Sequence, residues 1–138
     1  MIRIQYEPYD IGIEINRIKT ISKSIGALTV FEGIARDFSN DHIVEKLDFE
    51  CYLEMTENKL SIIEKQAKEK YNIIELSIIH RIGPIGTGEG IVLILVVASH
   101  RAAAYEANQW CIDEIKRSVP IWKKEYTKNG DAWIVLHP

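Results

Sequence analysis

The sequence predicts an α+β fold: a mostly antiparallel sheet with helices on one side of it and a β-hairpin at the C-terminus. Three segments repeat apolar residues at helical spacing, whereas the others alternate or are rich in β-branched residues, as strands are. The expected order is helix, strand, strand, helix, strand, strand, helix, hairpin. Because strands follow one another without a helix between them, the order favours an α+β class with antiparallel pairing.

The first helix and the first strand lie in the N-terminal quarter. Asp10 is a suitable N-cap for a short helix with isoleucines at positions 11, 15 and 18, and this helix ends before Gly26. Residues 26–36 combine β-branched and aromatic side chains and are predicted to form a strand.

A polar loop is expected at residues 37–42, followed by a half-buried strand at residues 43–52 that alternates through Leu47, Phe49 and Cys51. Thr56 is the expected N-cap of a second helix, which runs to about residue 71 with an apolar stripe on one face.

The next segments alternate between strand and loop. Residues 73–83 alternate and predict a strand, and the glycine-rich residues 83–90 predict a flexible connector. This connector lacks the lysine and the following helix of a phosphate-binding P-loop. Residues 91–99 have no polar break, so they predict a central strand that is covered on both faces.

The longest helix is expected at residues 100–119, with Ser99 as its N-cap and Pro120 as its stop. Two runs, residues 121–127 and 132–137, then flank an Asn-Gly pair at positions 129 and 130. This pair favours a hairpin with a type I′ turn.

Length and composition limit the class of protein. The chain of 138 residues is expected to form one domain, residues 1–138, and its net charge of −3 argues against a nucleic-acid-binding protein. No apolar run approaches the roughly 20 residues of a membrane span, and no signal peptide is recognisable, so we expect a cytosolic protein that does not bind a membrane. Cys51 and Cys111 are expected to be reduced, and no spacing indicates a metal site or a cofactor.

Positive charge is concentrated towards the C-terminus. Residues 99–128 carry 6 Lys and Arg against 4 Asp and Glu, whereas residues 1–98 carry 11 against 15. His100 and Arg101 open the longest helix, where acidic residues are normally favoured by the helix dipole. A bound anion would explain these two residues, and a solvated pair of side chains is the alternative.

Two lysines lie on either side of Pro120. Lys116 sits at the edge of an apolar helix stripe, and alternation places Lys123 on the same strand face as Ile121 and Glu125. Lys116 either extends its ammonium group to water or is partly desolvated, with a lowered pKa. Arg36, at the end of the first strand, is either a solvated side chain or a further cation of an anion site, as is Lys124.

A second apolar face on the longest helix, made by Ala103, Ala107 and Trp110, is expected to meet a second chain.

Several motifs resemble those of the MoaE family, the catalytic subunits of molybdopterin synthase. They extend from Gly26 to Trp133 and include F-E-G-I-A-R, M-T, I-H-R-I-G, S-H-R, I-K-x-x-x-P-I-W-K-K-E and G-D-x-W. The resemblance implies an α/β hammerhead fold and a homodimer within a heterotetramer. A small ubiquitin-like sulfur carrier would insert its C-terminal Gly-Gly thiocarboxylate into the catalytic subunit. Two sulfurs would pass to cyclic pyranopterin monophosphate, forming the molybdopterin dithiolene.

The resemblance also implies roles for individual residues. Lys116 and Lys123 match the two catalytic lysines. The substrate-binding residues would be Ile34, Ala35, Arg36, His100, Arg101, Lys116, Lys123, Lys124 and Glu125. The chain departs from the family pattern at Ile112, where methionine is common, and at Ala132, where arginine is common. The alternative function is a non-catalytic, homodimeric module on the same fold that binds an anion or a nucleotide.

Overall fold

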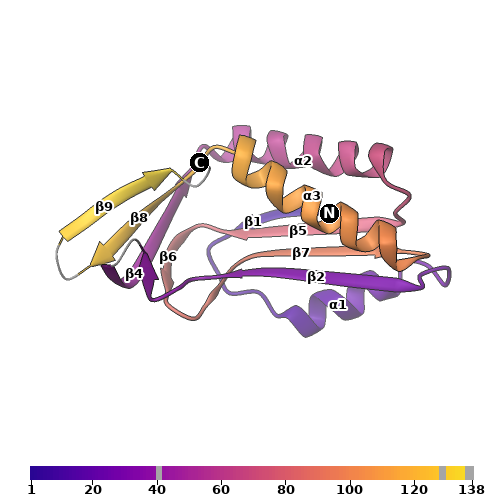
Figure 1. Ribbon diagram of the computed structural model, residues 1–138, viewed down its shortest axis with the longest axis horizontal. Coiled ribbons are helices and arrows are strands. Elements are labelled where there is room, and N and C mark those ends of the chain that lie inside the picture. Colours follow the sequence, from indigo (N-terminus) through magenta and orange to yellow (C-terminus); the bar gives the residue numbers. More distant parts are fainter. Residues whose placement is uncertain (40–41, 128–129, 136–138) are drawn as a thin grey trace.

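The structure is a computed structural model that describes residues 1–39, 42–127 and 130–135. These residues form three helices and two sheets (Figure 1). The helices are α1 (Ile11–Lys19), α2 (Leu53–Lys70) and α3 (Arg101–Ser118). The first sheet contains, in order, β1 (Ile2–Gln5), β5 (Glu75–Arg81), β7 (Gly90–Ala98) and β2 (Ala27–Ile34). The second contains β3 (Phe38–Ser39), β4 (His42–Cys51), β8 (Ile121–Thr127) and β9 (Gly130–Val135), with β6 (Gly83–Gly86) paired to β4.

The helices cover both faces of the first sheet, so the expectation of helices on one side only is wrong. α2 and α3 lie on one face, and α1 lies on the other (Figure 1). The reason is the central strand β7, which is buried on both faces as predicted. Ile94 and Val96 belong to the core under α2 and α3, whereas Leu93 and Leu95 pack with α1. A strand that is apolar on both faces needs cover on both. None of the described helices is both long enough and apolar enough to cross a membrane.

Strand β1 was not predicted. It pairs in parallel with β5, with Ile2 opposite Ile78, and therefore makes the first sheet mixed. Its alternation of isoleucine with polar residues is a short period-two signal. β5 is also more deeply buried than a half-buried alternating strand, because six of its seven residues are buried.

Two segments that were expected to be loops contain strands of the second sheet, β3 and β6. Phe38 and Ser39 pair with the start of β4, within the segment expected to be a polar loop. β6 pairs with β4 and places buried Ile85 opposite Leu47, so the glycine-rich connector is a strand over its first half. Gly83 has a φ of +84°, and a Cβ there would lie 2.7 Å from Cδ1 of Tyr6, which explains the glycine.

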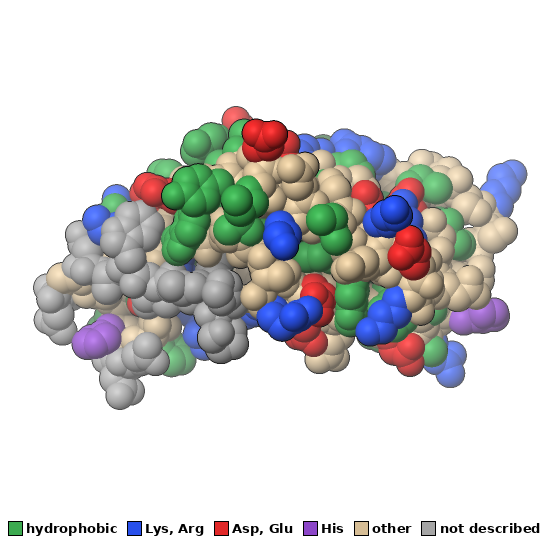
Figure 2. Space-filling model, turned by 90° about the horizontal axis from the view of Figure 1, so that it is seen from above, with side chains coloured by type: hydrophobic (Ala, Val, Ile, Leu, Met, Phe, Trp, Pro, Cys, Tyr) green, Lys and Arg blue, Asp and Glu red, His purple; other side chains and the backbone are tan. Residues whose placement is uncertain are grey.

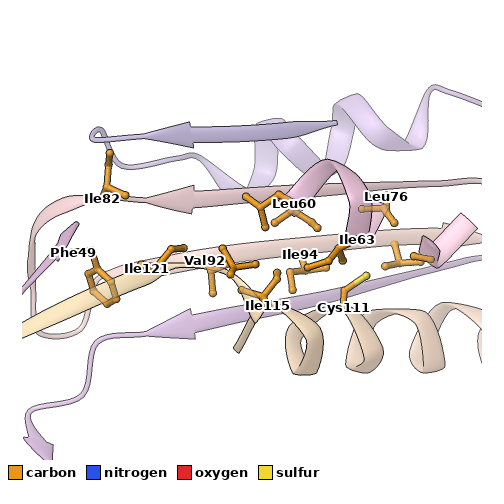
Figure 3. Packing of buried hydrophobic residues seen from close by; sticks show 14 of the residues in the cluster. Phe49, Leu60, Ile63, Leu76, Ile82, Val92, Ile94, Cys111, Ile115 and Ile121 are labelled. Atoms are coloured by element: carbon orange, nitrogen blue, oxygen red, sulfur yellow. The ribbon is translucent and has the colours of Figure 1, made fainter. Parts of the chain in front are cut away.

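The main core lies between the first sheet and the two helices above it. Figure 3 shows Leu60 and Ile63 of α2 and Ile115 of α3 packed towards Ile94 of the sheet. The same core continues into the second sheet through buried Ile121. The two sheets therefore share one apolar interior at the C-terminal end of α3.

The helix starts differ in their capping. Asp10 caps α1 as predicted, because its side chain accepts a hydrogen bond from the N–H of Ile13 at 3.0 Å. The predicted caps Thr56 and Ser99 are wrong: Tyr52 and His100 occupy the N-cap positions of α2 and α3, without side-chain cap bonds. Thr56 instead lies inside α2, where it is buried.

The C-terminal segment agrees with the prediction. α3 ends at Ser118, just before Pro120. β8 and β9 then pair antiparallel, with Thr127 opposite Gly130. The predicted type I′ turn depends on Asn129, which lies outside the described residues.

Candidate anion-binding pocket

A pocket of about 300 Å³ lies where the C-terminal end of α3 meets the second sheet. Its apolar lining includes four residues labelled at one end of the core in Figure 3: Phe49, Val92, Ile115 and Ile121. They come from β4, β7, α3 and β8, so the pocket exists only once both sheets and α3 have assembled.

β8 places two of the predicted residues in this pocket. Ile121, Lys123 and Glu125 line it together, as expected for alternate residues of one strand. The Nζ atom of Lys123 lies 3.7 Å from Oε2 of Glu125, which is buried. This is a long ion pair, so Lys123 retains donors for a ligand.

Lys124 lies on the other face of β8, with Tyr126. Its Nζ atom is 5.1 Å from the centre of the Tyr126 ring, and the residue is not part of the pocket lining. Its predicted ligand contact therefore requires a ligand or partner that extends beyond the pocket, and it stays a prediction.

Ile34, Ala35 and Arg36 all line the pocket. The register of β2 against β7 shifts between Gly33 and Ile34, and such a bulge redirects the residues that follow it. Arg36 is exposed, with its guanidinium carbon 5.4 Å from the centre of the Phe38 ring. The segment that follows β2 thus brings a further cation to the pocket that β8 also lines.

Backbone hydrogen bonds fix the segment that carries Arg36. The Ala35 N–H donates to the Glu89 carbonyl at 2.9 Å, and the Gly88 N–H donates to the Ala35 carbonyl at 2.7 Å. The Arg81 guanidinium, which is buried, in turn donates to the Glu89 carboxylate and to the Gly90 carbonyl, both at 3.2 Å. The turn between β6 and β7 is therefore held on one side by Arg81 and on the other by the segment at Ala35.

Lys116 lines the pocket but its side chain is exposed. Of the two alternatives for this lysine, the described part of the chain favours an ammonium group that extends to water over a desolvated one. Within that part, neither Lys116 nor Arg36 has an ion-pair partner. Arg36, Lys116 and Lys123 face one carboxylate, Glu125, so the charged side chains give the pocket a net positive charge. Such an arrangement suits an anionic ligand.

His100 and Arg101 are not brought into this pocket. Both are exposed at the N-terminal end of α3, and the first turn of α3 contains no acidic residue. Arg101 and Lys116 are 15 positions apart, which at 1.5 Å per residue places them about 22 Å apart along the helix axis. Within one chain, the two groups of cations therefore form separate sites.

His80 lines the pocket and was not among the predicted site residues. It is 2% exposed, and its ring makes an edge-to-face contact with Phe49 at 5.8 Å between centroids. Burial lowers the pKa of His80 to about 4, although the hydrogen bond with the Arg81 carbonyl opposes this effect, so the imidazole is neutral at pH 7. The sequence pattern that could have identified His80 is strand alternation, which places it on the same strand face as the buried Ile78.

The face of α3 that was expected to meet a second chain packs within the chain instead. The Trp110 ring lies 6.1 Å from the ring of Tyr71 and 5.3 Å from Nζ of Lys70, and Ala107 is fully buried. That interpretation of Ala103, Ala107 and Trp110 is wrong, because α2 covers this side of α3.

A different surface of α3 is open. Tyr105 of α3 is 67% exposed, and Val30 of the edge strand β2 is 43% exposed. Together with neighbouring residues they line a groove between α3 and β2. Exposed apolar side chains next to an unpaired strand edge are typical of a protein interface.

The fold and the pocket define an α+β protein of two sheets with a cationic pocket at the junction between them. The chain matches the MoaE protein family over residues 4–118. A molybdopterin synthase catalytic subunit from Pyrococcus abyssi is 39% identical over 128 residues, which are 93% of this chain and 86% of the relative. The crystal structure of molybdopterin synthase from Staphylococcus aureus matches with a TM-score of 0.88 and 40% identity, covering 96% of this chain and 95% of that one.

A complex of subunits 1 and 2 of molybdopterin-converting factor from Helicobacter pylori has the same fold, with a TM-score of 0.78 at 23% identity over 96% of this chain and 88% of that one. The chain belongs to the MoaE family.

Proposed function

We propose that this chain, as a molybdopterin synthase catalytic subunit of the MoaE family, transfers sulfur in the pocket between its two sheets. The observation that carries the proposal is the convergence on one pocket of Arg36, which follows β2, Lys116 of α3 and Lys123 of β8. In the expected reaction two carrier thiocarboxylates each pass one sulfur to cyclic pyranopterin monophosphate, and each carrier is left with an ordinary C-terminal carboxylate. The described fold would act as one catalytic domain in the cytosol.

The charge of the pocket suits this reaction because both reactants are anions. The substrate carries a phosphate group, and the carrier ends in a thiocarboxylate. Bringing two anions together requires fixed positive charge, which Arg36, Lys116 and Lys123 supply. Lys116 and Lys123 are the proposed nucleophile or proton carriers, and Ile34, Ala35 and Glu125 complete the walls around the reacting groups.

A surface beside the pocket suits the carrier. Seen from the helical side, hydrophobic side chains gather near the end of the helical layer that adjoins the second sheet (Figure 2). Tyr52, Leu53 and Met55 at the start of α2 are 50–65% exposed, and the Tyr52 ring packs on Trp122 at 5.1 Å between centroids. Trp122 directly precedes Lys123 in β8. A carrier docked on this surface could extend its Gly-Gly tail, which lacks bulky side chains, into the pocket.

A homodimer would give His100 and Arg101 a role at this site. The groove between α3 and β2 offers a surface for a second copy. A two-fold axis perpendicular to α3 reverses the direction of the partner helix, so the N-terminus of one α3 would approach the C-terminus of the other. The anion-binding residues His100 and Arg101 would then reach the pocket of the partner subunit.

Mixed dimers test this arrangement. Co-expressed Arg101→Ala and Lys116→Ala chains should regain about a quarter of wild-type activity, because half of the dimers are mixed and each of those contains one intact site. If both residues acted on the same chain, no activity would return. A monomeric mass by light scattering at micromolar concentration would refute the dimer itself.

The alternative, a non-catalytic anion- or nucleotide-binding module, is favoured by no specific observation. Such a module has little need for Lys116 and Lys123 together in one pocket. The deciding experiment mixes the purified protein with thiocarboxylated carrier and cyclic pyranopterin monophosphate. Formation of the dithiolene product supports the enzyme, whereas ligand binding without product supports the module.

A further inference from the structure

His80 has a fixed protonation pattern inside the pocket. Its Nδ1 atom lies 2.7 Å from the carbonyl oxygen of Arg81. A carbonyl oxygen can only accept, so Nδ1 must carry the proton of the neutral ring. The other nitrogen, Nε2, is then a bare lone pair that can accept a hydrogen bond and cannot donate one.

The Nε2 atom has no partner among the described residues. It is not sealed inside the protein either, because Asn108 Oδ1 is the one fully enclosed side-chain polar atom without a partner in residues 1–39, 42–127 and 130–135. His80 lines the pocket, and its Nδ1 edge is occupied by the carbonyl of Arg81. The Nε2 atom is therefore accessible from the pocket.

The other ionisable groups of the pocket differ in kind from this acceptor. Arg36 and Lys116 only donate, whereas the Glu125 carboxylate accepts but carries a negative charge and lies 3.7 Å from Nζ of Lys123. Ser39, also in the lining, has a hydroxyl that donates as readily as it accepts. His80 is thus the neutral side chain of the lining that accepts a hydrogen bond without also donating one to the ligand.

We propose that Nε2 of His80 accepts a hydrogen bond from an N–H group of the ligand and so sets the orientation in which that ligand lies in the pocket. This inference rests on the proposed function, which supplies two ligands with such donors: the amide N–H groups of the Gly-Gly tail and the ring N–H groups of the pterin. His80 is a positioning residue in this scheme, and the lysines carry the chemistry.

The direct test is nitrogen NMR of the wild-type protein with ¹⁵N-labelled histidine. The free protein should show His80 with Nδ1 protonated and Nε2 bare. One sample then receives carrier with an intact Gly-Gly end, and a second receives cyclic pyranopterin monophosphate. The Nε2 resonance should shift in one of the two samples, and that sample identifies the donor. Carrier truncated before the Gly-Gly end is the control for the first sample.

Two variants separate the two edges of the ring. His80→Asn keeps a donor for the Arg81 carbonyl but has no acceptor at the position of Nε2. His80→Gln carries an amide oxygen near that position. We expect the asparagine variant to bind the donor ligand about tenfold more weakly, raising KM with little change in kcat, and the glutamine variant to stay within about threefold of wild type. A purely structural role would instead make both variants less stable in urea without this difference in KM.

The outcomes distinguish this inference from the proposed function. If wild-type protein makes no dithiolene product, the function fails, and the NMR titrations still test His80. If product forms but neither ligand shifts the Nε2 resonance, the inference about His80 is overturned and the enzyme stands. Wild-type KM values for the asparagine variant would overturn it as well.

Discussion

The two ends of α3 carry similar residues and different surroundings. At the C-terminal end, Lys116 joins Arg36 and Lys123 around a pocket with an apolar floor. At the N-terminal end, His100 and Arg101 stand exposed, at an uncapped helix start. A charged side chain belongs to a binding pocket only where other elements line that pocket. Within the described chain, this holds for the C-terminal end of α3 and not for its N-terminal end. The other end has its helix N–H groups and positive dipole end available to a ligand or a partner.

The largest effect is expected from Lys116. Lys116→Arg keeps the positive charge but cannot give up a proton, so we expect sulfur transfer to fall by roughly 10²- to 10⁴-fold. Lys116→Ala should be similarly inactive and should still bind the carrier. The measurement is product formation at saturating carrier, with Lys65→Arg on the exposed face of α2 as the control. Activity of the arginine variant near that of wild type would leave Lys116 as an electrostatic anchor.

Arg101→Ala tests the opposite end of the helix. Loss of a charged hydrogen bond should weaken binding of the phosphate-bearing substrate by about 1.5–3 kcal/mol, with little change in the free energy of unfolding because the side chain is exposed. Titration calorimetry measures the affinity, and the control is Lys19→Ala, which removes an exposed charge from α1 on the other face of the first sheet. An unchanged affinity would show that the N-terminal end of α3 does not contact the substrate.

Acid should destabilise the protein through the buried His80. The pKa of buried His80 is lowered to about 4, whereas the ordinary value is 6.5. Below pH 6.5 the unfolded chain therefore takes up a proton before the folded chain does, so the free energy of unfolding falls as the pH decreases from 6.5 towards 4. The contribution is roughly 2 kcal/mol between pH 7 and pH 5.

Urea denaturation at both pH values measures this loss. His80→Gln should remove that part of the pH dependence, and His100→Gln, at the exposed end of α3, should retain it. Equal pH dependence in wild type and His80→Gln would mean that His80 is not neutralised by burial.

The smallest effect concerns the helix starts. Asp10→Ala should lower the free energy of unfolding by about 1 kcal/mol, because it removes the hydrogen bond to the N–H of Ile13. His100→Ala should cost almost nothing, because His100 makes no cap bond. Thermal unfolding of both variants compares them. A similar loss from His100→Ala would show that the start of α3 is a structural cap rather than a free anion site.

The sequence predicted the elements with strong periodicity. β7 and the β8–β9 hairpin were correctly assigned, because a continuous apolar run and alternation with a turn signal are local properties. The sequence did not show that β6 would pair with β4, since that pairing depends on Ile85 meeting Leu47 from far along the chain. Thr56 and Ser99 were wrongly predicted as N-caps because threonine and serine are common N-cap residues. In the structure the helices begin after Tyr52 and His100 instead.

The site was predicted in part for the same reason. Strand alternation placed Lys123 and Glu125 on one face, which the structure confirms. Within one helix the spacing of Arg101 and Lys116 already sets them about 22 Å apart. Contacts between elements were not available, and nothing in the sequence places His80 beside Phe49. The family resemblance identifies residues that take part in one reaction. It does not show which of these residues lie in the same pocket of a single chain.

The hydrogen bonds between Ala35 and the turn at Gly88 and Glu89 limit the insertions and deletions that this turn can accept. Polar surface turns usually tolerate inserted residues, because they pack against little. Here an insertion at Thr87 would displace the two backbone partners that hold Ala35, and the strand end bearing Arg36 would lose its anchor. The turn between β6 and β7 should therefore be constant in length although it lies on the surface, and a one-residue insertion there should reduce substrate binding more than it reduces the yield of folded protein.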